Sequence, residues 1–114
     1  MNIVTRKDLR GMLNQWQAGH VSAQDIHRWA EARYQMDDWD AEDRVANEVL
    51  WELDTLDMNL TIVEDVTTLL RELECKTENE ALELKKAYFD TIDYDKRQVA
   101  LRADPLYAPF CKER

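Results

Sequence analysis

The segment from residue 8 to residue 34 constrains the fold of this chain more than any other. Its first half places side chains at the i, i+3, i+4, i+7 spacing of an amphipathic helix, at Leu9, Met12, Leu13 and Trp16. Its second half repeats that spacing at Ile26, Trp29, Ala30 and Arg33. Between them, Gly19 suits a helix C-terminus and Ser22 suits the N-cap of a following helix. Two apolar stripes joined by so short a turn must face each other, so the chain opens with a helical hairpin.

Helical periodicity continues through the rest of the chain, which has only two Gly and two Pro among its 114 residues. We expect a third helix over residues 41–57, with Asp40 as its N-cap, and a fourth helix opened by a capping box at residues 61–64. A second capping box at residues 77–80 opens a fifth helix. Residues 95–103 either prolong that helix or form a short sixth one, and we favour the sixth helix.

The predicted fold class is therefore all-α: a compact bundle of five or six short helices in a single domain spanning residues 1–114. A chain of this length buries about two-thirds of its unfolded surface, which is enough for one core. Pro105 ends the helical part, and we expect residues 104–114 to form an extended tail that packs Tyr107 and Phe110 on the helices. The predicted core consists of Leu9, Leu13, Trp16, Ile26, Trp29, Val45, Val49, Leu53, Val66, Leu69, Leu70, Leu73, Leu84, Tyr88 and Ile92.

Acidic side chains dominate the middle of the chain. The sequence has 24 Asp and Glu against 15 Lys and Arg, a net charge of −9. Residues 36–95 account for this excess with 19 acidic and 5 basic side chains, whereas both flanking segments are weakly basic. Such a field repels nucleic-acid phosphates and anionic lipid, and it attracts cationic protein surfaces. Acidity that serves only solubility is the simpler alternative.

Cysteine usage and hydropathy bear on where the protein resides. Cys75 and Cys111 lie far apart without a partner pattern, and the first residues lack the apolar run of a secretory leader. We therefore expect a cytoplasmic protein with free thiols. Because no apolar stretch approaches the length that spans a membrane, we also expect a soluble chain with no membrane partner.

A DNA-binding helix-turn-helix matches the opening hairpin only in outline. That motif usually has a small residue where this chain has Gln15, and a β-branched apolar residue where it has Asp25. The net charge also opposes phosphate binding. We therefore expect no nucleic-acid partner.

Metal-dependent chemistry has little support in the sequence. A calcium loop starting at Asp38 would need Gly at the position of Asp43 and a bidentate Glu at the position of Val49. A magnesium-dependent helical hydrolase would need paired carboxylates on two helices, and the candidate pairs at residues 80–83 and 90–93 fall in one predicted helix. The histidines lack zinc-ligand spacing. We expect no cofactor, no metal and no enzymatic activity, and keep the hydrolase as the third hypothesis.

Protein binding has positive support because tryptophan is interleaved with the acidic segment. An aromatic anchor ringed by carboxylates suits a basic partner, since aromatic side chains supply binding energy and acids supply orientation and association rate. Core packing is the alternative role for these Trp side chains. The predicted contact residues are Asp37, Asp38, Trp39, Asp40, Glu42, Asp43, Glu48, Trp51, Glu52 and Asp54.

The pattern Trp16-x-x-Gly19-x-x-Ser22-x-x-x-Ile26-x-x-Trp29-Ala30, followed by the acidic connector at Asp37 and Asp38, resembles a loosely defined group of small acidic bacterial proteins. The resemblance covers roughly the first half of the chain. Members of the group are helical, and some are associated with toxin-immunity neighbourhoods. The resemblance implies no catalytic residues. It implies an immunity or antitoxin-type inhibitor of a basic, nuclease-like toxin, and a self-associating adaptor, such as a homodimer, is the alternative.

Overall fold

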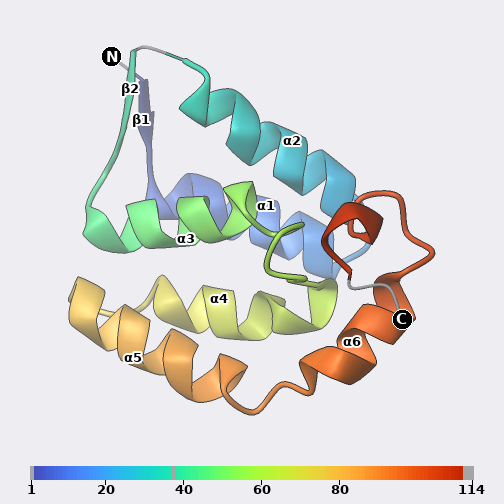
Figure 1. Cartoon of the computed structure of the whole chain (residues 1–114). Coiled ribbons are helices and arrows are strands. Elements are labelled where there is room, and N and C mark those ends of the chain that lie inside the picture. The colour runs from blue at the N-terminus through green and yellow to red at the C-terminus, as the bar shows by residue number, and fades with distance from the viewer. Residues whose placement is uncertain (1, 37, 112–114) are drawn as a thin grey trace.

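Six α-helices account for most of the residues that the computed structural model describes, which are residues 2–36 and 38–111. The helices are α1 Arg6–Gln17, α2 Ala23–Tyr34, α3 Arg44–Asp54, α4 Val66–Glu72, α5 Glu78–Phe89 and α6 Tyr94–Leu101. The predictions of a helical fold, of an opening α1–α2 hairpin and of a sixth helix are confirmed (Figure 1). No helix in the described part of the chain is long and apolar enough to cross a membrane.

Reciprocal side-chain caps define the start of the first two helices. The Thr5 hydroxyl accepts a hydrogen bond from the Asp8 amide at 3.0 Å, and the Asp8 carboxylate accepts one from the Thr5 amide at 3.0 Å. Ser22 and Asp25 form the same capping box at 3.1 and 2.9 Å. Gly19, with φ of 81°, adopts the left-handed conformation expected at the end of α1. Local sequence alone therefore specifies the hairpin turn.

Two predicted helix starts are wrong because tertiary contacts use the capping residues differently. α3 begins after Asp43, whose carboxylate accepts the Ala46 amide at 2.8 Å, while Asp40 lies in a strand. A 3₁₀ turn, Val63–Asp65, precedes α4 in place of the predicted capping box. The Thr61 hydroxyl is not free to cap a helix, because it donates inward to another side chain.

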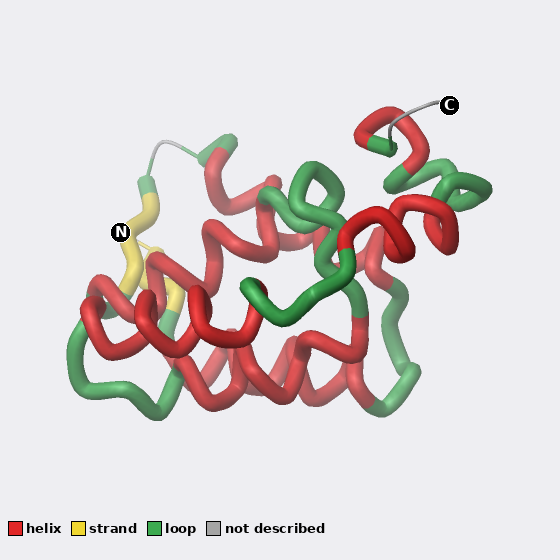
Figure 2. The backbone as a smooth tube through the Cα atoms, turned by 60° about the horizontal axis from the view of Figure 1, so that its bottom comes forward, coloured by secondary structure: helices red, strands yellow, loops and turns green. Residues whose placement is uncertain are grey.

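Two three-residue strands close one end of the molecule and were not predicted. β1 (Asn2–Val4) and β2 (Trp39–Ala41) pair in parallel, with Ile3 opposite Asp40. They lie at the end of the molecule away from α6 (Figures 1 and 2). A three-residue strand is too short to show a sequence period, and its partner is distant in the chain. The pairing fixes the N-terminus beside the connector between α2 and α3.

The core lies where α1 and α3 meet, with α2 packed on α3, α4 packed on α1, and α5 packed on α4 and α3 (Figure 1). Most of the predicted core residues are buried. The exceptions are half-buried: Trp29, Leu70, Leu84, Tyr88 and Ile92. Three of these five belong to α5 and the turn after it, because α5 lies at the edge of the bundle and buries only Ala81 fully.

The segment after α6 turns back on the helices, and its described part is not extended as predicted. Asp104 starts a turn by accepting the backbone amides of Tyr107 and Ala108, and a 3₁₀ helix, Ala108–Phe110, follows. Tyr107 is buried, in agreement with the expected packing, whereas Phe110 remains 42% exposed. The proline at position 105 ended the α-helix without enforcing an extended chain.

Candidate functional site

Exposed apolar side chains gather in a groove between α3, the loop after it, α5, α6 and the C-terminal 3₁₀ helix. The groove has a volume of about 640 Å³, which is in the range of ligand pockets. Trp51 is 46% exposed there and Met58 is 58% exposed. The apolar walls comprise Trp51, Met58, Leu82, Phe89, Tyr94 and Phe110. Of these side chains, Trp51, Met58, Leu82 and Phe110 are exposed, so their surfaces are available to a ligand.

The floor of the groove holds an ammonium group between two carboxylates and an indole ring. Lys85 Nζ lies 3.2 Å from Glu48 Oε2 and 3.2 Å from Glu52 Oε2. The same nitrogen lies 5.5 Å from the centroid of the Trp51 ring, within cation–π range. Burial alone would lower the pKa of Lys85, but the nearby charges of Glu52, Glu72 and Glu48 outweigh it and raise that pKa. We call Glu48, Trp51 and Glu52 the cation cradle.

A third carboxyl group lies behind the cation cradle and is fully buried. Glu72 in α4 has 0% exposure, and neither of its carboxyl oxygens has a hydrogen-bond partner among the described residues. Burial raises the pKa of Glu72 to about 8; Glu52 and Glu48 add to the rise, and Lys85 opposes it. At neutral pH most molecules therefore keep Glu72 protonated, which avoids the cost of an unpaired buried charge.

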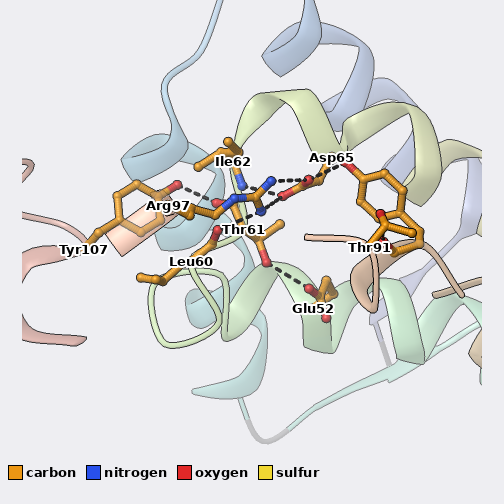
Figure 3. Close-up of polar contacts among 9 residues, drawn as sticks. Glu52, Leu60, Thr61, Ile62, Asp65, Thr91, Arg97 and Tyr107 are labelled. Atoms are coloured by element: carbon orange, nitrogen blue, oxygen red, sulfur yellow. Dashed lines mark hydrogen bonds and ion pairs between the residues drawn. The ribbon is translucent and has the colours of Figure 1, made fainter. Parts of the chain in front are cut away.

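A second polar cluster surrounds Asp65, which is also fully buried (Figure 3). Arg97 of α6 binds its carboxylate in a bidentate manner, at 2.8 Å through Nη1 and 3.2 Å through Nη2. The Tyr88 hydroxyl donates to the same carboxylate at 2.6 Å, and the Ile62 amide donates at 2.8 Å. Burial, and next the hydrogen bond to Asp65, raise the pKa of Tyr88 to about 12. Asp65 therefore connects α5, through Tyr88, and α6, through Arg97, to the start of α4.

Leu60 and Thr61 together connect the two clusters (Figure 3). The hydroxyl of Thr61 donates to Glu52 Oε1 at 2.8 Å, and the Thr61 carbonyl accepts the Tyr107 hydroxyl at 2.5 Å. The preceding residue, Leu60, lines the groove in a left-handed conformation with φ of 54°, and its carbonyl accepts Arg97 Nη1 at 3.2 Å. These bonds hold α6 and the C-terminal segment, which form one wall of the groove, against the end of α3.

The predicted contact residues fall into two separate groups. The first group lies at the strand end, where internal contacts occupy most of its members. Glu42 accepts the Arg6 backbone amide at 2.8 Å, and Asp43 caps α3 and pairs with Arg6 Nε at 2.9 Å. Trp39 is half-buried and packs edge-on against Tyr34, with ring centroids 4.8 Å apart. Asp38 and Asp40 are exposed, and Asp37 lies outside the described residues.

The second group lies on α3, and its acids are buried or half-buried, not exposed. Glu52 is buried at 3% exposure, and Glu48 is partly buried beside it. Asp54 is also half-buried, and burial raises its pKa. The sequence was compatible with either a buried or an exposed Trp51, and the structure shows that Trp51 is exposed in the groove. Glu48 and Glu52 are therefore not the exposed acids that a partner-contact surface requires, because both pair with Lys85.

The carboxylate pairs considered for magnesium do not come together. Asp93 caps α6 by accepting the Lys96 amide at 3.1 Å, and Glu80 accepts the Lys76 amide at 3.2 Å. Within residues 2–36 and 38–111, no group of three or more His, Cys, Asp or Glu is arranged to hold a metal ion. His27 instead joins α2 to the end of α3, with Nε2 at 3.4 Å from Asp57.

Sequence reasoning missed the residues that organise the site, namely Lys85, Glu72, Asp65 and Arg97. One signal was present for Glu72, because it lies three residues after Leu69 and therefore on the apolar face of its helix. A carboxylate on an apolar stripe predicts a buried counter-ion or a neutral acid. No comparable signal marks Lys85, since its partners are on another helix.

The fold and its groove define a small, mostly helical protein with a ligand-sized apolar site above a buried ionic cluster. Comparisons of this chain with models of protein families, with curated proteins and with solved structures found no match.

Proposed function

We propose that this protein is a non-enzymatic binding module that acts as an immunity or antitoxin-type inhibitor of a basic, nuclease-like protein. The observation that carries the proposal is the gathering of exposed apolar side chains, Trp51 among them, into one groove of a chain with net charge −9. Central aromatic side chains dominate the energy of many interfaces, and charge complementarity raises association rates. The resemblance to small acidic immunity-associated proteins is consistent with this assignment.

The acidic side chains of α3 are not the main source of the attractive charge, as the sequence suggested they would be. Glu48 and Glu52 of α3 are engaged with Lys85, so exposed acids elsewhere, such as Asp40 and Glu64, supply the long-range field. In our proposal this field brings the cationic partner close, and the groove then binds an apolar side chain of that partner. The bound inhibitor covers the basic surface that nucleic acid would otherwise occupy.

Site-specific photo-crosslinking tests this proposal. A benzoylphenylalanine placed at Trp51 should crosslink to a cationic protein, whereas the same group at the exposed Lys7 on α1 should not. The purified partner should then bind the wild-type protein with an affinity that falls as salt rises, and it should lose its nuclease activity in the complex. A purified complex without inhibition, or equal crosslinking from both positions, would contradict the proposal.

Self-association is the second candidate, because an exposed apolar groove can also bury a second copy of the chain. In that case the group at position 51 crosslinks to another copy of this protein. Light scattering then shows a dimer that persists as salt rises, since apolar contacts are not screened. A monomer at all salt concentrations excludes this alternative.

A further inference from the structure

We propose that the cation cradle is a binding site for an organic cation, and that its occupant in the complex is a Lys or Arg side chain of the basic partner. This inference deepens the proposed function and rests on it. It names the chemical group that the groove recognises, beyond the general attraction between opposite charges.

The protein's own Lys85 demonstrates the chemistry of the site. Its ammonium group lies between the carboxylates of Glu48 and Glu52 and over the face of Trp51. A planar ring with carboxylates beside it stabilises ammonium and guanidinium groups through cation–π attraction and charge-assisted hydrogen bonds. Any cation that reaches this position meets the same partners.

The balance of charge leaves room for a second cation. The carboxylates of Glu48 and Glu52 share the single ammonium of Lys85, and the carboxyl group of Glu72, which keeps its proton at neutral pH, lies close enough to influence them. Glu72 is fully buried, and both of its oxygens lack a hydrogen-bond partner among the described residues. In our proposal the incoming cation takes the place between Glu48 and Glu52, and Lys85 turns inward to pair with Glu72. Glu72 releases its proton to solvent as it pairs with the Lys85 ammonium, so that each of the three carboxylates then has a cationic partner.

The groove provides the access route for such a side chain. Trp51 and Glu52 of the cradle line the space of about 640 Å³ together with Lys85, whose ammonium group also contacts Glu48. The aliphatic stem of Lys or Arg buries well along apolar walls while its charged head binds polar groups. Leu82 and Phe89 of α5 supply such walls next to Lys85.

Titration with hexylammonium tests the site without the partner protein. Chemical shifts of the Trp51 indole, assigned with the Trp51→Phe variant, should change saturably with a millimolar dissociation constant. Hexanol and hexanoate, which share the same chain, should bind at least about tenfold more weakly. Equal binding of hexanol would show an apolar pocket only and would overturn the inference, as would no binding of hexylammonium.

Substitutions of two lysines, one in the groove and one outside it, provide a matched control. Lys85→Met removes the resident cation and should strengthen hexylammonium binding by about tenfold or more, whereas Lys7→Met, at an exposed position on α1 away from the groove, should leave it unchanged. Should Lys85→Met fail to fold, Glu48→Gln provides the test, because it removes one partner of the cation at a partly exposed position and should weaken binding several-fold. If the Lys85→Met protein folds and binds hexylammonium with unchanged affinity, the role of the cradle is contradicted. If it does not fold, unchanged affinity of Glu48→Gln for hexylammonium contradicts that role.

A third titration identifies the source of the cation. A short peptide with Lys between two Leu residues should bind as hexylammonium does, and the peptide with norleucine in place of Lys should not. Binding of the free amine without the Lys peptide would assign the site to small amines and overturn the role of a partner side chain. These titrations do not use the partner, so their failure is separate from failure of the inhibition assay above.

Discussion

Replacing Glu72 by Gln should make this protein more stable, and the gain should grow with pH. In the folded state burial holds the proton on Glu72 up to a pKa of about 8, whereas in the unfolded chain the group has its ordinary pKa of 4.5. Between these two values the folded state binds more protons than the unfolded state. The free energy of unfolding of the wild-type protein therefore falls as pH rises through this window. Gln cannot ionise, so the variant lacks this loss.

The magnitude follows from the two pKa values. Each pH unit between 4.5 and about 8 costs the wild-type protein about 1.4 kcal/mol. The advantage of Glu72→Gln should therefore increase by about 3 kcal/mol between pH 4.5 and 7, and by about 4 kcal/mol between pH 4.5 and pH 8 or above. This is a large share of the stability of a typical domain, about 5–15 kcal/mol.

Urea unfolding followed by circular dichroism at pH 5, 6, 7 and 8 measures this effect. Glu74→Gln is the matched control, because it removes the same charge from an exposed position nearby and should leave the pH dependence of the wild-type protein unchanged. Parallel stability curves for Glu72→Gln and the wild-type protein would refute the reasoning. They would mean that Glu72 is ionised in the folded protein and that the charge of Lys85 offsets its burial.

Three further substitutions test contacts that hold the groove and the opening hairpin in place. Arg97→Met leaves Asp65 buried without its cation and should cost about 3–5 kcal/mol in urea unfolding; a loss below 1 kcal/mol would contradict the buried pair. Tyr107→Phe removes the donor to the Thr61 carbonyl and should cost about 1–3 kcal/mol, with faster amide exchange in α6 as its signature. Ser22→Ala removes the cap of α2 and should cost about 1 kcal/mol by the same measurement, and an unchanged midpoint would be inconsistent with the cap.

Local sequence accounts for much of this fold. The helix starts after Thr5 and Ser22 and the turn at Gly19 depend on side chains within three residues of one another, so the same physics operates in the isolated segment. Apolar periodicity likewise identified most of the core, because burying one face of each helix is possible in only a few arrangements. Where a prediction failed, distant residues were involved: Asp40 pairs with Ile3 in a strand, and Tyr107 of the C-terminal segment bonds to Thr61.

The candidate site was accessible to sequence reasoning only in part. Trp51 lies off the main apolar stripe of its helix, which left both an exposed and a buried position open until the structure showed it in the groove. The acids of α3 could be counted from the sequence, but their direction depends on Lys85, which lies more than thirty residues away in α5. The net charge of a sequence predicts the electrostatic field around the protein. Which charged side chains pair with one another depends on their neighbours in the folded structure.

What the sequence by itself determined is the helical class, the opening hairpin and the overall acidity, because caps, periodicity and charge are properties of short segments or of simple sums. What only the tertiary structure decided is the groove, the cation cradle, the buried Glu72 and the Asp65–Arg97 pair. Each of these forms where helices from distant parts of the chain meet. The pKa and the exposure of a side chain are set by those neighbours, and no local pattern records them.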